Sequence, residues 1–256
     1  MRPFTEYTIR VKAVGTTGET AETESSFQTG RLDTPWNAKW ITDNCYSFPD
    51  KLSPVPLTFR KRFSAQKKVA RAWVNASALG IYELELNGHK IGADYFAPGF
   101  TSYEHQIQYQ TYPITHLLEK HNCIKATIAG GWAAGSFTYH RKSHISCDRQ
   151  ALLCEIWLEY EDGTRDVIGT DESWQVTEDT PFLLAEWYDG ETYDVCFDEG
   201  TAVWKAADVT APKGTPRLIA QYGNSVRAMG GLHRQTGAPE KGIPNRLCAA
   251  AAFRND

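Results

Sequence analysis

Short runs in which apolar residues alternate with polar ones fill the chain between residues 57 and 195. Residues 82–86 form one such run, which leads into Asn87-Gly88, a dipeptide typical of two-residue hairpin turns. Similar runs recur at 70–76, 107–109, 124–128, 152–160, 167–168 and 174–176. Only Thr115 to His121 has a helical pattern, about two turns long. Many short strands with almost no helix predict an all-β fold, a jelly-roll-like β-sandwich over residues 57–200.

The first thirty residues predict a separate pair of strands. Tyr7, Ile9, Val11 and Ala13 alternate with polar neighbours, and a turn with two glycines follows at residues 15–18. An isolated pair of strands is not stable in water, so this hairpin is expected to need a partner. It resembles the last hairpin of a fibronectin-type-III-like module, a remnant whose earlier strands are missing, and Met1 is then an internal start.

The remaining segments connect or follow these elements. Residues 31–56 are expected to form a linker that Trp36 and Trp40 fix to the next unit. Residues 201–256 are expected to hold part of a further segment and an irregular tail, because the last thirty residues lack period-two alternation and include four consecutive alanines. This composition suggests a tail without a core of its own and a truncated or altered coding sequence.

Charge and hydropathy exclude two classes of partner. Lys and Arg number 27 against 31 Asp and Glu, a formal net charge of −4, and the basic residues are scattered. A nucleic-acid binder needs a basic stripe, so that class is not expected. No apolar run approaches the roughly 20 residues that a membrane span requires. We therefore expect no nucleic acid and no membrane among the partners.

Six cysteines occur without a CxxC pair or regular spacing, at Cys45, Cys123, Cys147, Cys154, Cys196 and Cys248. A chain of this length does not need a disulfide scaffold, and a zinc site needs closer grouping. Free thiols are the better interpretation. They favour a reducing compartment such as the cytoplasm, although localisation stays open because the native N-terminus is expected to lie upstream.

Three motifs admit more than one chemistry. The Gly130–Gly135 segment (GGWAAG) lacks the following helix of a phosphate loop. It suits either a tight turn with a core Trp132 or a concave loop that presents the indole to a sugar. His140 and His144 share a face only on a helix, so we interpret them as solvated loop residues rather than zinc ligands. No complete GxSxG motif supports an esterase, since the sequence around Ser225 lacks the final glycine.

An acidic turn follows Trp187. Asp189, Glu191 and Asp194 lie beside aromatic residues, where carboxylates could serve hydrolysis, bind sugar hydroxyls or coordinate calcium. A solvated, glycine-centred turn is the plain alternative. The spacing of these acidic residues does not distinguish between these interpretations.

Five segments in order resemble the N-terminal β-sandwich of bacterial α-L-rhamnosidases of glycoside hydrolase family 78. They are Ala76–Thr115, Gly130–Gly135, Cys147–Thr164, Thr170–Val176 and Tyr188–Val195. The resemblance covers about Trp36 to Asp198. In that family a C-terminal (α/α)6 barrel carries the catalytic carboxylates, and the long helices of such a barrel are absent here. The resemblance therefore implies a non-catalytic fragment, with the missing catalytic domain as a partner.

In some relatives the equivalent sandwich binds rhamnose with a calcium ion. Trp132, Asp148 and Arg149 match the family's motifs, but Ala133 replaces a tyrosine, and Ser146-Cys147 replaces Tyr-Gly. The residues expected to bind sugar are Trp132, Asp148, Arg149, Trp187, Asp189 and Glu191. Asp148 and Asp189 are candidate calcium ligands, although no cofactor is expected to be required.

The leading interpretation is a carbohydrate-binding or structural accessory domain of an α-L-rhamnosidase acting on rhamnose-containing plant glycans or glycosides. The rivals are a small glycosidase or esterase with its own site in the sandwich, and a pure scaffold. We also expect self-association of the fragment, since an unpaired hairpin at residues 1–30 exposes strand edges.

Overall fold

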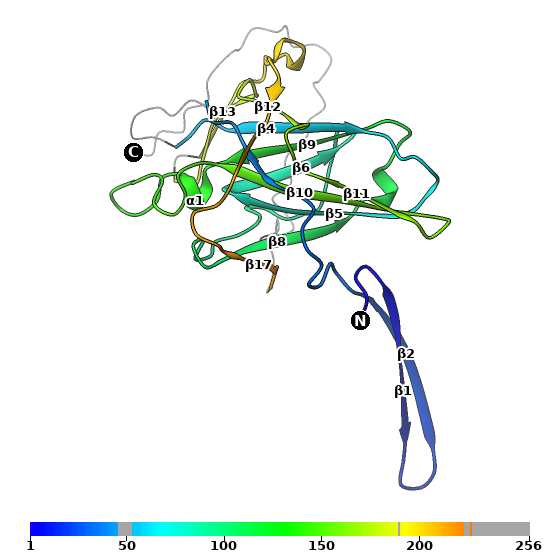
Figure 1. The fold of residues 1–256 in the computed structure, drawn as a ribbon. Helices are drawn as coiled ribbons and strands as arrows, with labels where there is room; N and C mark the ends of the chain where they lie inside the picture. The colour runs from blue at the N-terminus through cyan, green and yellow to red at the C-terminus, as the bar shows by residue number, and fades with distance from the viewer. Residues whose placement is uncertain (46–52, 189, 223–225, 227–256) are drawn as a thin grey trace, which may run out of the picture. The chain divides into compact units, whose positions relative to one another are not determined.

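The computed structural model describes residues 1–45, 53–188, 190–222 and 226, and it divides into two compact units, Met1–Trp36 and Asn37–Asp256 (Figure 1). Cys248, Ser225 and the tail from residue 227 lie outside the described residues. No helix in the described part of the chain has the length and hydropathy needed to cross a membrane.

The first unit is the predicted hairpin, β1 (Glu6–Val14) and β2 (Thr20–Gln28), paired antiparallel along its whole length. Successive side chains of a strand point to opposite faces, so the ribbon has two different faces. One face carries cross-strand ion pairs, and the other carries Tyr7, Ile9, Val11 and Ala13 of β1 together with Phe27 of β2. The ring of Tyr7 stacks on Phe27 with centroids 5.7 Å apart.

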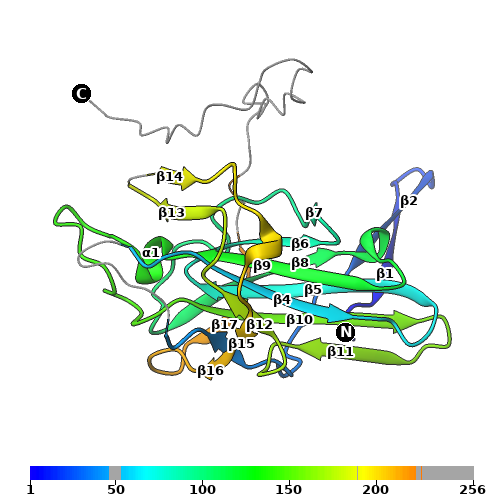
Figure 2. The same cartoon turned by 90° about the horizontal axis from the view of Figure 1, so that it is seen from above.

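The second unit contains two large sheets, which Figure 1 shows as layers and Figure 2 shows from above, and one small hairpin described below. The larger has strand order β16-β3-β10-β5-β8-β17, and β11 pairs with β10. Its strands are β3 (Trp40–Thr42), β5 (Val69–Leu79), β8 (Gln106–Pro113), β10 (Ala151–Tyr160), β11 (Arg165–Gly169), β16 (Asp208–Thr210) and β17 (Arg217–Ala220). All neighbours are antiparallel except β17 and β8, which run parallel.

The smaller sheet has the order β15-β12-β4-β9-β6-β7 and is antiparallel throughout. Its strands are β4 (Leu57–Phe63), β6 (Ile81–Leu86), β7 (His89–Lys90), β9 (Asn122–Ala129), β12 (Gln175–Thr177) and β15 (Lys205–Ala206). The turn between β6 and β7 is the predicted Asn87-Gly88 pair, in which both residues have positive φ.

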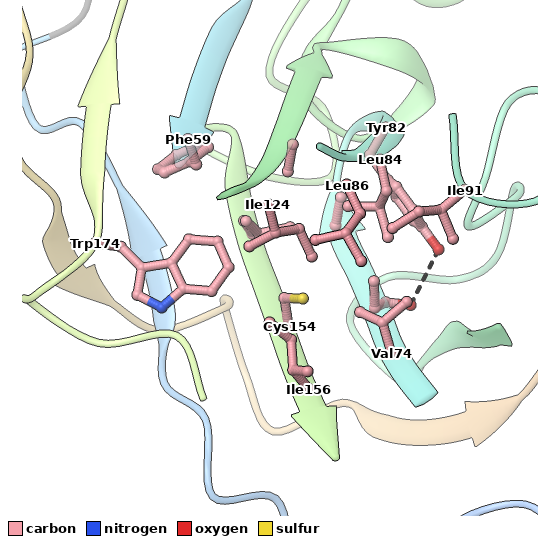
Figure 3. Close-up of a cluster of buried hydrophobic side chains, with 14 of the residues drawn as sticks. Phe59, Val74, Tyr82, Leu84, Leu86, Ile91, Ile124, Cys154, Ile156 and Trp174 are labelled. Atoms are coloured by element: carbon pink, nitrogen blue, oxygen red, sulfur yellow. Dashed lines mark hydrogen bonds between the residues drawn. The ribbon is translucent and has the colours of Figure 1, made fainter. Parts of the chain in front are cut away.

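The core lies between the facing surfaces of these sheets. Every second residue of β6 and β9 is buried there, as the alternation predicts, and the central strands β5 and β10 contribute their own alternate residues. Figure 3 shows part of this cluster, including Trp174, which is fully buried. The indole Nε1 of Trp174 donates a hydrogen bond to the carbonyl of Gly169 at 2.9 Å, so its one polar atom is satisfied.

The predicted all-β sandwich is confirmed. The helix expected over Thr115 to His121 is wrong: only Thr115–Leu117 forms a single 3-10 turn, η1, and Leu118 is already extended. The strand β9 begins at Asn122, where the chain joins the smaller sheet. Within the expected linker, β3 pairs with β10 and β16, and residues 205–220 supply three further strands to the sandwich.

Candidate functional site

The glycine-rich segment Gly130–Gly135 folds into a single short helical turn, α1 (Gly131–Ala134). Gly131 has φ +49°, and a Cβ added there would lie 2.6 Å from Cγ2 of Ile81. Only glycine allows this close approach at positive φ without strain. Ala133 is buried in a cluster with Leu79 and Cys147, while Trp132 is only partly buried against that cluster. The tight turn thus leaves Trp132 partly accessible to solvent.

A second tryptophan comes from a small hairpin at the same end of the sandwich (Figures 1 and 2). The strands β13 (Phe182–Glu186) and β14 (Gly190–Tyr193) form a two-stranded sheet of their own. Trp187 directly follows β13, and its ring lies against Trp132 with centroids 4.7 Å apart and planes tilted by 56°. Two motifs that are 55 positions apart (187 − 132) are therefore one structural feature.

The loop before β8 adds two phenylalanines to this pair. The ring of Phe96 lies edge-on to Trp132 at 6.0 Å and to Trp187 at 6.1 Å, and Phe100 lies 6.2 Å from Trp132. Tyr188 extends the group beyond Trp187 at 6.1 Å. We call Phe96, Phe100, Trp132, Trp187 and Tyr188 the aromatic patch. Except for Trp132, its members are 41–56% exposed, a contiguous surface of a kind that marks binding sites.

A buried carboxylate lies beneath the patch. Glu186, the last residue of β13, is only 6% exposed. Its Oε1 accepts the backbone N–H of Trp187 at 2.8 Å, and its Oε2 accepts the backbone N–H of Ser136, just after α1, at 3.0 Å. The same N–H of Ser136 also donates to Oγ of Ser53 at 2.8 Å. Glu186 therefore joins the hairpin to the α1 turn through backbone hydrogen bonds.

The loop that follows α1 borders the patch with polar side chains. The guanidinium of Arg141 lies 5.3 Å from the ring centre of Tyr188, a cation–π contact. His140 contacts the highly exposed Tyr139, and burial lowers the pKa of His144. Neither histidine is on a helix, and no group of three potential metal ligands occurs among the residues that the structure describes.

A backbone hydrogen bond brings Asp148 and Arg149 close to the α1 turn. The N–H of Cys147 donates to the carbonyl of Ala133 at 2.9 Å, which brings the following residues to this turn. Arg149 binds the carboxylate of Asp148 at 3.1 Å and Oδ1 of Asn44 at 2.6 Å. The sequence-predicted pair therefore lies close to the α1 turn, and the carboxylate of Asp148 is paired with the guanidinium of Arg149.

Glu191 of the acidic turn lies in strand β14. Glu191 is exposed on β14 and pairs with Ala185, whereas Glu186 pairs with Gly190. Because neighbouring strand positions point to opposite faces, Glu191 lies on the face of the hairpin opposite to Glu186. Asp189 lies outside the described residues.

Asp148, one of the two candidate calcium ligands, is engaged with Arg149. Ca²⁺ takes six to eight oxygen ligands, but Oδ2 of Asp148 is bound to Arg149, and no cluster of three acidic, histidine or cysteine side chains accompanies it within the described ranges.

Sequence reasoning found both tryptophans but missed Phe96, Phe100 and Glu186. The phenylalanines flank Ala97-Pro98-Gly99, so an aromatic residue on each side of a Pro-Gly turn was an available signal. Glu186 had no such signal, because a glutamate at the end of a short strand is ordinarily exposed.

Comparison with known proteins gives one consistent family. Residues 67–228 match the family model described as the alpha-L-rhamnosidase N-terminal domain. An alpha-L-rhamnosidase of Formosa agariphila is 31% identical over 220 residues, which are 79% of this chain and 24% of that protein. This chain thus spans about a quarter of the length of that curated relative.

Solved structures agree with this result. The alpha-L-rhamnosidase from Dictyoglumus thermophilum superposes with a TM-score of 0.74 at 28% identity, covering 87% of this chain and 27% of that one. A Streptomyces avermitilis alpha-L-rhamnosidase, solved in complex with L-rhamnose, gives a TM-score of 0.62 at 27% identity, covering 84% and 23%.

Proposed function

Because the chain belongs to the family of alpha-L-rhamnosidase N-terminal domains, we propose that it is a non-catalytic domain that binds rhamnose-containing carbohydrate within a longer α-L-rhamnosidase. The observation that carries this proposal is the pair formed by the partly buried Trp132 and the exposed Trp187 at the centre of the aromatic patch. The catalytic domain of that longer enzyme is the proposed partner of the chain, and rhamnose-bearing plant glycans or glycosides are its proposed ligands.

The chemistry of rhamnose suits such a surface. Its sixth carbon is a methyl group, which gives the sugar an apolar edge that an indole ring can cover. The vicinal hydroxyls then need charged or polar partners at the border of the rings. Arg141 borders Tyr188, and Asp148 with Arg149 lies beside the turn that holds Trp132. The L-rhamnose in the Streptomyces avermitilis structure is consistent with this ligand class for the family.

A scaffold role is the second candidate, favoured by the exposed aromatic side chains themselves. Apolar surface of this kind also suits packing against another domain. The two candidates differ in one measurable respect, because a scaffold has no affinity for free sugar.

We expect isothermal titration with L-rhamnose to show saturable binding that Trp187→Ala weakens at least tenfold, about 1.4 kcal/mol. Trp204→Ala is the matched control, since Trp204 packs on Arg60 and does not belong to the aromatic patch. Galactose, which has no methyl group, should bind more weakly. Titration with and without added calcium checks the separate expectation about Asp148 and Asp189.

Equal and negligible heats for both sugars in the wild type would refute carbohydrate binding and leave the scaffold role. Turnover of nitrophenyl rhamnoside or a nitrophenyl ester by the purified chain would contradict the non-catalytic assignment.

A further inference from the structure

The geometry points to Glu186 as the positioning residue that holds Trp132 and Trp187 in their paired arrangement. The inference deepens the proposed function and rests on it for the role of the pair in sugar binding. The arrangement of the two rings is measurable without any sugar, so the two ideas can fail separately.

The two oxygens of Glu186 bind the two segments that carry the tryptophans. Oε1 accepts the N–H of Trp187 itself at 2.8 Å. Oε2 accepts the N–H of Ser136 at 3.0 Å, and Ser136 lies four positions after Trp132 (136 − 132), at the exit from α1. One side chain therefore fixes both the start of the β13–β14 turn and the end of the α1 turn.

Close packing restricts where this carboxylate can lie. A Cβ added to Gly135 would be 2.9 Å from Oε2 of Glu186 and 2.4 Å from the carbonyl oxygen of Gly131. The glycine thus allows the carboxylate to reach the backbone of the α1 turn. The side chain is 6% exposed, so water cannot readily replace the hydrogen bonds that a substitution removes.

The cost of burying a carboxylate indicates that Glu186 does more than fill space in the interior. A buried carboxylate has a large desolvation cost, and an apolar residue of similar volume is often as stabilising or more so. The carboxylate differs from an apolar residue in accepting two backbone N–H groups at once, with directional hydrogen bonds. The gain is a defined orientation of the β13–β14 hairpin relative to the α1 turn, since β13 and β14 pair only with each other among the described strands.

Glu155 provides a matched control elsewhere in the sandwich. It is also a buried glutamate, accepting the N–H of Asn37 and the indole Nε1 of Trp157. Like Glu186 it is a buried acceptor, and its partners Asn37 and Trp157 do not belong to the aromatic patch.

The first measurement is far-ultraviolet circular dichroism, because two closely packed indoles couple their excited states and produce a paired positive and negative band. This pair of bands, called the couplet, is obtained by subtracting the spectrum of Trp187→Phe from that of the wild type. Glu186→Ala should abolish it, and Glu186→Gln, which keeps the shape but retains only one acceptor oxygen, should reduce it. Glu155→Gln should leave it unchanged.

The second measurement is the affinity for L-rhamnose in a double-mutant cycle. We expect Glu186→Ala to weaken binding at least tenfold, and Glu186→Gln to weaken it less. In a Trp187→Phe background, removal of Glu186 should cause little further loss, because the pair is already broken. A residue with only a structural role would lower the affinity by the same factor in both backgrounds.

An unchanged couplet in both Glu186 variants, or fully additive losses in the cycle, would overturn the inference. If Glu186→Ala does not fold, Glu186→Gln decides by the same criteria. A wild type that shows the couplet, loses it on Glu186 substitution and binds no sugar would support the positioning role while refuting the proposed function.

Discussion

At the scale of single residues, burial sets the chemistry of two cysteines. Burial raises the pKa of the Cys147 thiol to about 12, and burial likewise raises the pKa of Cys154, which is completely enclosed in the core. Both thiols stay protonated and unreactive at neutral pH, because the thiolate is the reactive form. Among the cysteines that the structure describes, Cys45 and Cys196 are exposed and Cys123 is partly accessible.

These raised pKa values predict a loss of stability in alkali. In the unfolded chain both thiols ionise above about pH 8.5, while the folded chain keeps their protons. The unfolded state then binds fewer protons, so the free energy of unfolding falls as pH rises. Each thiol contributes about 1.4 kcal/mol per pH unit between the two pKa values.

The measurement is urea unfolding at pH 7, 9 and 10 for the wild type and for the double variant Cys147→Ser, Cys154→Ala. The contribution of the two thiols to the free energy of unfolding should be constant up to about pH 8.5 and should decline above that pH. The double variant should show a shallower decline, and comparison with it removes the contribution of buried tyrosines. Identical slopes would contradict the assignment.

At the scale of elements, the α1 turn needs Gly131 for its close approach to β6. Gly131 combines positive φ with contacts of 2.6 Å and 3.1 Å between an added Cβ and two atoms of Ile81. Gly163 is a matched control, because its φ is +79° and an added Cβ meets no atom within 4 Å. Both substitutions incur the cost of a left-handed backbone, roughly 1–2 kcal/mol, but only Gly131→Ala also displaces β6 or α1.

We therefore expect Gly131→Ala to lower the free energy of unfolding by at least about 1 kcal/mol more than Gly163→Ala. It should also change the tryptophan fluorescence, since Trp132 is on the displaced turn. Urea titrations followed by fluorescence test both effects together. Equal losses for the two variants would show that the contact with Ile81 relaxes freely.

At the scale of the whole molecule, the β1–β2 ribbon presents an apolar face. Ile9 and Val11 are about half exposed on that face, while Arg10 pairs with Glu24 at 2.9 Å on the other. An amphipathic ribbon with free strand edges favours pairing with another strand or sheet. A second copy of the chain carries the same apolar face and is the partner we expect.

The double variant Ile9→Thr, Val11→Thr should shift the chain toward monomer in light scattering over a concentration series. Arg10→Gln with Lys12→Gln changes the opposite face and should leave self-association unaltered. Deletion of residues 1–30 should act like the apolar-face variant. A wild type that remains monomeric at millimolar concentration would contradict the prediction.

Local patterning determined the fold class of this protein. The alternation in β6 and β9 placed Leu84, Leu86 and Ile124 on the core face before any tertiary contact was known. Asn87-Gly88 fixed the β6–β7 turn in the same way, because its positive φ angles are a property of those two residues. The helical pattern at Thr115 to His121 failed since strand pairing of β9 outweighed a weak local preference.

Only the tertiary structure decided the composition of the site. Trp132, Trp187 and Phe96 come from three loops that no short-range pattern links, and their rings meet because the sandwich brings those loops to one end. Glu186 became a buried acceptor for the same reason. Sequence periodicity reports which face of an element is buried, whereas contacts between distant loops depend on how the completed sheets pack.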